Sequence, residues 1–220
     1  MQALKAVLFD LDGTLIDTNE VIIASYTHAY QQILPELDTD RSRIIDEIGP
    51  PLWDIFGRYA PNSKTVDRLV HAYHDYYKKH EATMHRLYPN VIKTLKALKK
   101  RNIKIGIVTT KRKSAAQPSI DHYGLNDYFD VVIGYDDVTH PKPHKEPVEK
   151  ALIALNHHSQ ALMVGDNQSD ILSGQAAGVL TAGVAWSIKG RAHLEAVNPD
   201  YILTSMEDCL TIVDRYNEED

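Results

Sequence analysis

The sequence predicts an α/β protein with a doubly wound, parallel, Rossmann-like sheet and a small helical cap domain inserted after the first strand. Short apolar runs without polar alternation, typical of strands buried on both faces, alternate with helical segments over most of the chain. Strands that alternate with helices imply right-handed crossovers, and hence a parallel sheet. Residues 17–86 interrupt this alternation, because they show helical periodicity and almost no strand-like run.

The first predicted strand is Ala6-Val7-Leu8-Phe9, which ends abruptly at Asp10. Asp12 and Gly13 follow, so that a glycine turns the chain directly after two carboxylates. Ligands bind at this carboxyl edge in open α/β sheets, which makes the stretch a candidate site. An Asp-Gly turn with solvated acids is the alternative interpretation of the same residues.

The inserted region is expected to form four helices with short connections. Apolar residues recur at helical spacing over residues 21–34, and Pro35 ends this helix. The segment Gly49-Pro50-Pro51 imposes a loop between two short helices. Ser63 is a typical N-cap for a long helix that reaches about residue 81. We therefore expect residues 1–16 and 87–220 to form the α/β core and residues 17–86 to form a hinged cap.

From residue 88 onward the pattern predicts alternating helices and strands. The expected helices cover residues 91–100, 114–123, 147–155, 170–177 and 205–214. The expected strands cover residues 103–108, 129–133, 161–164, 180–185 and 200–203.

Composition and charge limit the classes of protein to consider. A formal net charge of -6 argues against attraction to nucleic acid by bulk charge. The single cysteine, Cys209, excludes an intramolecular disulfide and favours a reducing cytoplasm. No apolar run approaches the roughly 18 residues of a membrane span, and no signal-peptide pattern is present. We expect a cytoplasmic monomer or homodimer with no nucleic-acid or membrane partner.

Polar side chains follow three of the predicted strands, and one loop adds a lysine between two prolines. Because parallel strands bring their carboxyl ends to one edge, these groups are expected to converge. Carboxylates hold a hard divalent cation, usually Mg2+, and a hydroxyl and an ammonium then bind phosphoryl oxygens. Without the cation, a carboxylate about 4 Å from a phosphate would be repelled by several kcal/mol. The residues concerned are Asp10 with Asp12, Thr109 with Thr110, Asp166 and Lys142.

This set resembles the four motifs of the haloacid dehalogenase superfamily of phosphotransferases, over about residues 4–208. The matching segments are FDLDGT at residues 9–14, IVTTK around Thr109, HPKP around Lys142 and VGDNQSD at residues 164–170. Segments outside these motifs, such as Ile48-Gly49-Pro50-Pro51-Leu52 and Gly183-Val184-Ala185-Trp186, are similar to the branch of bacterial inorganic pyrophosphatases that is related to phosphoglycolate phosphatases.

The resemblance implies a role for each matching residue. Asp10 would be the nucleophile that forms an aspartyl-phosphate, and Asp12 the general acid and then the general base. Mg2+ would be bound by Asp10, by the backbone carbonyl of Asp12 and by Asp166, with Asp170 as a further ligand or a support.

The same resemblance assigns the contacts to the substrate. Thr109 and Lys142 would hold the transferring phosphoryl group, and spare amides at Gly13 and Thr110 could donate to its oxygens. Lys111 is a candidate substrate contact. In the cap, the loop at Gly49 and Pro50 would help to select the substrate.

The function that the resemblance implies is that of a magnesium-dependent phosphohydrolase that acts on inorganic pyrophosphate. A phosphoglycolate phosphatase or a broad small-molecule phosphomonoesterase is the alternative. From another class, a phospho-accepting signalling domain also combines an acceptor Asp with a Thr and a Lys. Asp12 argues against it, because a general acid and base beside the nucleophile shortens the lifetime of an acyl phosphate.

The eleven histidines are interpreted as having no role in the chemistry. His71 and His74 lie three apart on one predicted helix, but no third ligand completes a zinc pattern there. His140 and His144 flank Lys142 and are interpreted as ordinary loop histidines, with contact to a leaving group as the alternative.

Overall fold

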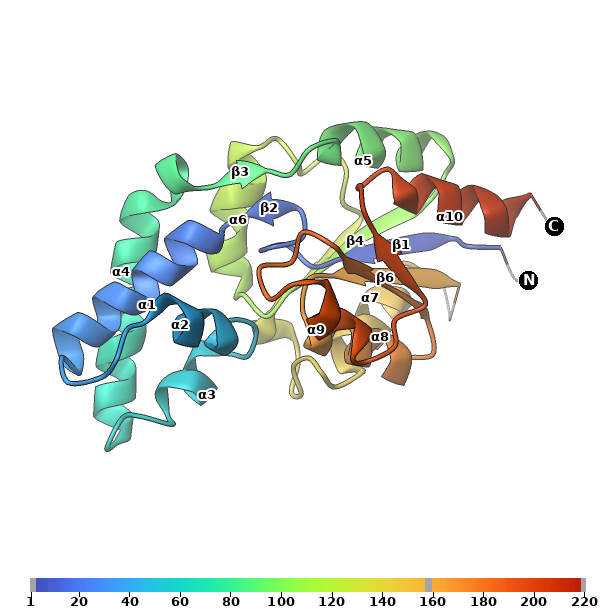
Figure 1. Ribbon diagram of the computed structural model, residues 1–220. Helices are drawn as coiled ribbons and strands as arrows, with labels where there is room; N and C mark the ends of the chain where they lie inside the picture. The colour runs from blue at the N-terminus through green and yellow to red at the C-terminus, as the bar shows by residue number, and fades with distance from the viewer. Residues whose placement is uncertain (1–2, 157–159, 219–220) are drawn as a thin grey trace. The chain divides into compact units, whose positions relative to one another are not determined.

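The computed structural model describes residues 3–156 and 160–218. Its centre is a six-stranded sheet in the order β5-β4-β1-β6-β7-β8, in which every neighbouring pair is parallel (Figure 1). The predicted α/β class with a parallel, doubly wound sheet is thus confirmed. The strands are β1 (Ala6–Phe9), β4 (Lys104–Val108), β5 (Val131–Ile133), β6 (Ala161–Gly165), β7 (Leu180–Val184) and β8 (Tyr201–Leu203).

Helices cover both faces of this sheet, and β1 lies in its middle with all four residues buried. Val7 and Phe9 belong to one core cluster, which also includes buried residues of α5, α6 and α10. Ala6 and Leu8 point to the opposite side, into a cluster with buried residues of α7. The helices are α5 (Val91–Lys100), α6 (Lys113–His122), α7 (Glu146–Ala154), α8 (Gln168–Ala176), α9 (Arg191–Glu195) and α10 (Asp208–Asn217).

The register of the three central strands brings their carboxyl ends together. Phe9 of β1 lies opposite Ile107 of β4 and Val164 of β6. The next residue, Asp10, is fixed by its amide, which donates to the Val164 carbonyl at 2.9 Å. Thr109 and Asp166 follow the last residues of β4 and β6, so the sheet itself places them at the edge where Asp10 lies.

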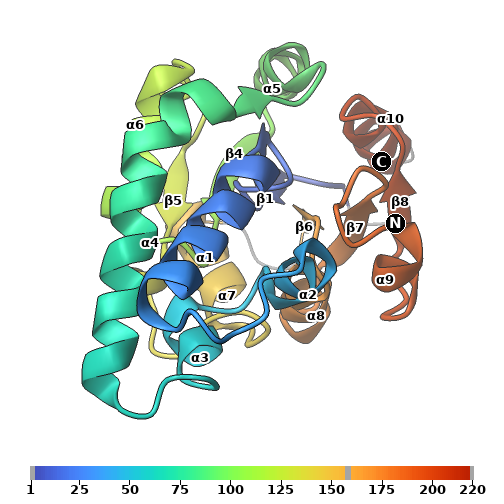
Figure 2. The ribbon, with the colours of Figure 1, turned by 60° about the vertical axis from the view of Figure 1, so that its left-hand side comes forward.

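The chain divides into two compact units, residues 1–16 with 87–220 and residues 17–86. In the second unit α1 and α4 pack side by side (Figure 2). Its core is aromatic: the Tyr26 ring contacts the rings of Phe56 and Tyr73 at centroid distances of 5.4 and 5.1 Å. The helices are α1 (Asn19–Ile33), α2 (Arg41–Glu47), α3 (Leu52–Phe56) and α4 (Ser63–Met84).

Several short elements were not predicted. The two-residue strands β2 (Ile16–Asp17) and β3 (Arg86–Leu87) pair where the chain enters and leaves residues 17–86. The three-residue 3-10 turn η1 (Tyr135–Asp137) and the five-residue helix α9 are also short. Elements of this length show no measurable periodicity and depend on tertiary contacts. Within the part of the chain that the structure describes, no helix has the length and apolar character needed to cross a membrane.

Candidate active site

Lys142 lies at the centre of the buried polar cluster at the carboxyl edge of the sheet. Its Nζ donates to Asp10 Oδ1 at 2.9 Å, to the Val108 carbonyl at 2.9 Å and to Asp170 Oδ1 at 2.5 Å. Burial alone would lower the pKa of this ammonium, but the carboxylates of Asp10 and Asp170 outweigh burial and raise it. Lys142 is therefore a permanent positive charge that is held between two acids and a strand end.

Asp166 is fixed by two hydroxyl groups. Thr14 Oγ1 donates to Asp166 Oδ1 at 3.1 Å, and Ser187 Oγ donates to the backbone carbonyl of Asp166 at 2.7 Å. Both bonds are buried, so the first holds the carboxyl group and the second holds the backbone of Asp166 without competition from water.

The cluster carries more negative charge than Lys142 neutralises. One carboxyl oxygen from each of Asp10, Asp166 and Asp170 lies within 4.8 Å of the other two. Burial raises the pKa of Asp10 to about 7 in spite of Lys142, and the charge on Asp170 adds to this effect. Burial and the charges of Asp10 and Asp170 also raise the pKa of Asp166 well above its usual range. A cation bound among these oxygens would relieve this repulsion.

Asp170 differs from the other two acids because both of its oxygens already accept hydrogen bonds. Oδ1 accepts from Lys142, and Oδ2 accepts from the Asn167 amide at 2.9 Å. The second bond lies at the start of α8, where the Asp170 amide donates in return to the backbone carbonyl of Asn167 at 3.1 Å. The start of this helix thus fixes Asp170 in place.

The remaining side chains of the predicted site lie on the β1 and β4 ends. Thr109 is buried, and its hydroxyl oxygen accepts from the Lys111 amide at 3.1 Å, which leaves its proton for another acceptor. The Lys111 Nζ lies 3.3 Å from the Asp12 carboxylate. The structure therefore brings the predicted acids, hydroxyl and lysines together at one edge of the sheet. These residues are Asp10, Asp12, Thr109, Lys111, Lys142, Asp166 and Asp170.

Gly13 was expected to donate its amide to a phosphate oxygen, but its part at the carboxyl edge of the sheet is a different one. Its amide already donates to the Ile16 carbonyl at 2.8 Å, so the expectation of a spare Gly13 amide is wrong. The chain instead needs glycine here for its φ of +79° and for space. An added Cβ would lie 2.4 Å from Asp166 Oδ2. Phosphate binding by the Thr110 amide stays a prediction.

Gly13→Ala is expected to destabilise the protein by at least about 1–2 kcal/mol, because an L-residue is strained at this φ. The new methyl group would also push the Asp166 carboxyl out of place, so activity should fall further than stability explains. Urea unfolding and turnover measure the two effects. Gly178→Ala is the matched control: its φ is +72°, but no atom lies within 4 Å of an added Cβ. Equal losses of activity in the two variants would contradict the crowding argument.

Gly49 and Pro50 lie elsewhere in the chain, in the loop between α2 and α3 of the helical unit. Their predicted part in substrate selection stays a prediction.

The sequence analysis missed three contributors to the site. Thr14 lies inside the first motif and could have been inferred from it, whereas Ser187 and the Val108 carbonyl carry no local signal.

Comparison with known proteins identifies the class to which this fold and donor set belong. The model of the family "Haloacid dehalogenase-like hydrolase" matches residues 7–184. The chain belongs to this family, and it is accordingly a hydrolase of the phosphatase type. The predicted resemblance is confirmed, and membership of a hydrolase family supports an enzyme over a signalling domain.

Individual proteins with similar sequences or structures are named as phosphatases or hydrolases of this family. The chain is 42% identical to a protein named pyrophosphatase PpaX from Bacillus cereus, over 97% of this chain and 98% of the relative. It is 43% identical to a PpaX from Bacillus thuringiensis over the same shares. Among solved structures, a haloacid dehalogenase-like family protein from Streptococcus pneumoniae has a TM-score of 0.81 at 28% identity, covering 95% and 98% of the two chains. A predicted phosphoglycolate phosphatase from Haemophilus somnus has a TM-score of 0.84 at 25% identity, covering 96% and 99%.

Proposed function

We propose that this protein is a magnesium-dependent phosphohydrolase that uses an aspartyl-phosphate intermediate and hydrolyses inorganic pyrophosphate. The observation that carries the proposal is the buried cluster of Asp10, Asp166 and Asp170 around one lysine, at the carboxyl edge of the sheet. The names of the full-length relatives support pyrophosphate as the substrate.

The acidic cluster fits a hard divalent cation. It offers only oxygen donors, which Mg2+ prefers, and the raised pKa values of Asp10 and Asp166 reflect a repulsion that a cation would remove. Asp10 and Asp166 would hold the ion with the backbone carbonyl of Asp12. Asp170, which pairs with Lys142 and with the start of α8, would be a further ligand or a support. When bound, Mg2+ would neutralise part of the phosphate charge and polarise the phosphate oxygens.

The chain's own residues would transfer the phosphoryl group twice, first to Asp10 and then to water. An Asp10 oxygen forms a bond to phosphorus while the bond from phosphorus to the leaving oxygen breaks, and Asp12 protonates that oxygen. Asp12 then takes a proton from water, the water oxygen attacks the same phosphorus, and the bond to Asp10 breaks. Lys142 and the Thr109 hydroxyl would bind the oxygens of the phosphoryl group throughout.

Pyrophosphate differs from most phosphomonoesters because its leaving group is itself highly charged. Lys111 lies 3.3 Å from the Asp12 carboxylate, so it can reach the oxygen that Asp12 would protonate. We propose that Lys111 binds the leaving phosphate, and that residues 17–86 act as a cap whose Gly49 and Pro50 loop helps to select it.

Removal of divalent cations with EDTA is expected to abolish turnover, and Mg2+ should restore it. Asp166→Asn should raise the Mg2+ concentration needed for half-maximal activity by about tenfold or more, because it removes a charged ligand. The measurement is a magnesium titration of initial rates. Asp200→Asn is a suitable control, since Asp200 accepts hydrogen bonds from Thr181 and has no part in the cluster. An unchanged midpoint in Asp166→Asn would refute the ligand assignment.

A panel of pyrophosphate, phosphoglycolate and alkyl phosphate monoesters, whose leaving group carries no phosphate or carboxylate charge, tests the substrate. Pyrophosphate is expected to show the highest kcat/KM, and a preference for phosphoglycolate would identify the alternative. Lys111→Ala should lower kcat/KM for pyrophosphate by about 10- to 100-fold more than for alkyl phosphates, since a hydrogen bond to a charged group contributes about 1.5–3 kcal/mol. The control Lys113→Ala removes a neighbouring lysine that pairs with Asp137 at 3.0 Å. The same loss for every substrate would exclude a leaving-group role.

A further inference from the structure

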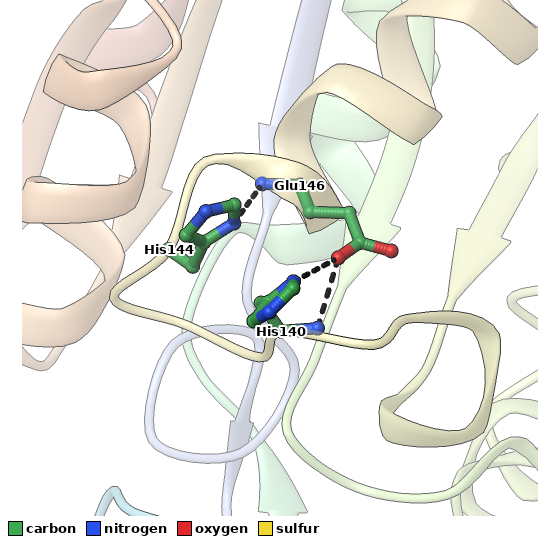
Figure 3. Close-up of side chains that lie close together, drawn as sticks. All are labelled: His140, His144 and Glu146. Carbon is green, nitrogen blue, oxygen red and sulfur yellow. Dashed lines mark hydrogen bonds and ion pairs between the residues drawn. The ribbon is translucent and has the colours of Figure 1, made fainter.

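A second group of potential ligands lies on the loop that carries Lys142. His140 and His144 are exposed on this loop, and Glu146 is the first residue of α7 (Figure 3). One ligand atom from each of the three lies within 4.8 Å of the other two. The centroids of the two imidazole rings are 4.7 Å apart. Within residues 3–156 and 160–218, this is the other group of this kind besides the buried acids.

Hydrogen bonds hold the loop in the shape that brings these side chains together. The Glu146 carboxylate accepts from the amides of Thr139 and His140, both at 2.9 Å. The His144 amide donates to the Pro141 carbonyl at 3.0 Å, and Ser173 Oγ of α8 donates to the His144 carbonyl at 2.7 Å. The backbone is therefore closed and tied to α8, so that only side chains would have to adjust to a ligand.

We propose that His140, His144 and Glu146 bind a divalent transition-metal ion such as Zn2+ or Ni2+, at a site separate from the acidic cluster. The donor set decides the class of ion. Imidazole nitrogens suit Zn2+, Ni2+ and Cu2+, whereas the all-oxygen cluster suits Mg2+. Two neutral imidazoles and one carboxylate are also the number of protein ligands that zinc takes when it keeps an open coordination position.

The ring orientations are compatible with this site. The His140 Nδ1 lies 3.1 Å from Glu146 Oε2, and the Glu146 amide donates to His144 Nδ1 at 3.1 Å (Figure 3). Tetrahedral zinc with bonds of about 2.0–2.2 Å places its ligand atoms about 3.4 Å apart, so the His140–Glu146 pair is already close enough and only the more distant atoms of the group have to approach. Both imidazoles are exposed, so they can turn toward Glu146 without disturbing the core.

Occupation of this site would restrain the segment that carries Lys142. His140 and His144 lie on either side of Pro141-Lys142-Pro143. An ion that bridges them would fix both ends of this segment. Because an ion that binds only the folded chain stabilises it by mass action, the melting temperature should rise with zinc concentration.

The test is calorimetric titration of ZnCl2 into the full chain with MgCl2 in excess, so that magnesium competes for the acidic cluster. Wild-type protein is expected to bind one equivalent, and its melting temperature should rise. The double variant His140→Ala/His144→Ala should lose both effects. The double variant His71→Ala/His122→Ala removes the same number of histidines, including the one that lies 3.2 Å from Asp75, and should keep both effects.

Circular dichroism in the absence of zinc shows whether each variant is folded. Binding that persists in folded His140→Ala/His144→Ala would overturn the proposal, as would the absence of zinc binding to the wild type. Loss of binding in the His71→Ala/His122→Ala control would place the ion away from this loop and overturn the proposal equally. None of these outcomes depends on the substrate or on Mg2+ catalysis, so the proposed hydrolase function can fail or stand independently.

Discussion

Asp10→Asn is expected to lower turnover at least about 10³-fold while the protein stays folded, because an amide cannot form the acyl-phosphate bond. The change preserves the shape of the side chain at the end of β1. The measurement is the steady-state rate under saturating Mg2+ with the preferred substrate. Asp127→Asn, at an exposed position in the same unit, is the control and should keep the wild-type rate. A near-normal rate in Asp10→Asn would remove the nucleophile assignment.

The same variant is expected to be more stable than the wild type when no divalent cation is present. Burial raises the pKa of Asp10 from 3.8 to about 7, so the folded state binds this proton more tightly than the unfolded state does. The free energy of unfolding therefore falls as the pH rises from about 4 to about 7, and the loss is complete above pH 7. Asp10→Asn lacks this contribution and should lose less stability over that window. Parallel pH profiles of urea unfolding for the two proteins would contradict this expectation.

Lys142→Met is expected to lower both activity and stability strongly. The change leaves the buried carboxylates of Asp10 and Asp170 without their shared cation, and breaking a buried ion pair in this way costs about 3–5 kcal/mol. Loss of a preorganised charge on the phosphoryl oxygens should lower kcat by about 10²- to 10³-fold. Urea unfolding and initial rates measure the two losses.

Lys145→Met is the matched control for this variant. Lys145 lies three residues further along the same loop and pairs with Glu149 at 2.8 Å, with about half of its side chain exposed. Such surface changes usually alter stability by no more than about 0.5 kcal/mol. Similar losses in the two variants would show that the loop, and not the buried charge of Lys142, is responsible. Excess Mg2+ should partly restore the stability of Lys142→Met, because the bound ion neutralises the negative charges of the same carboxylates.

The sequence predicted the sheet well, because each strand of the sheet is a short apolar run between helical segments. The run at residues 6–9 is β1 without change of boundary, and the strand expected at 161–164 is β6 (Ala161–Gly165). The convergence of Asp10 and Asp166 also followed from the rule that parallel strands share one carboxyl edge. These features depend on local pattern and on topology, both of which one sequence contains.

The finer contacts could not be predicted, because they join residues that are distant in the chain. Ser187 supports Asp166 only because β7 lies beside β6, and no local pattern shows this. The Gly13 amide looked available since nothing in the sequence shows that the turn closes on the Ile16 carbonyl. The His140, His144 and Glu146 group is similar: the closed loop, and not the spacing alone, brings the three side chains together.

The register of β1, β4 and β6 has a consequence for how the active site can change over evolution. Asp10, Thr109 and Asp166 directly follow the ends of neighbouring strands, so their mutual distances are set by strand pairing and not by the lengths of the connecting segments. Inserted modules and loops other than the one that carries Lys142 can be exchanged while these three residues keep their positions. Insertion of one residue inside β1 would instead turn the later side chains of this strand to the other side of the sheet and separate Asp10 from its partners.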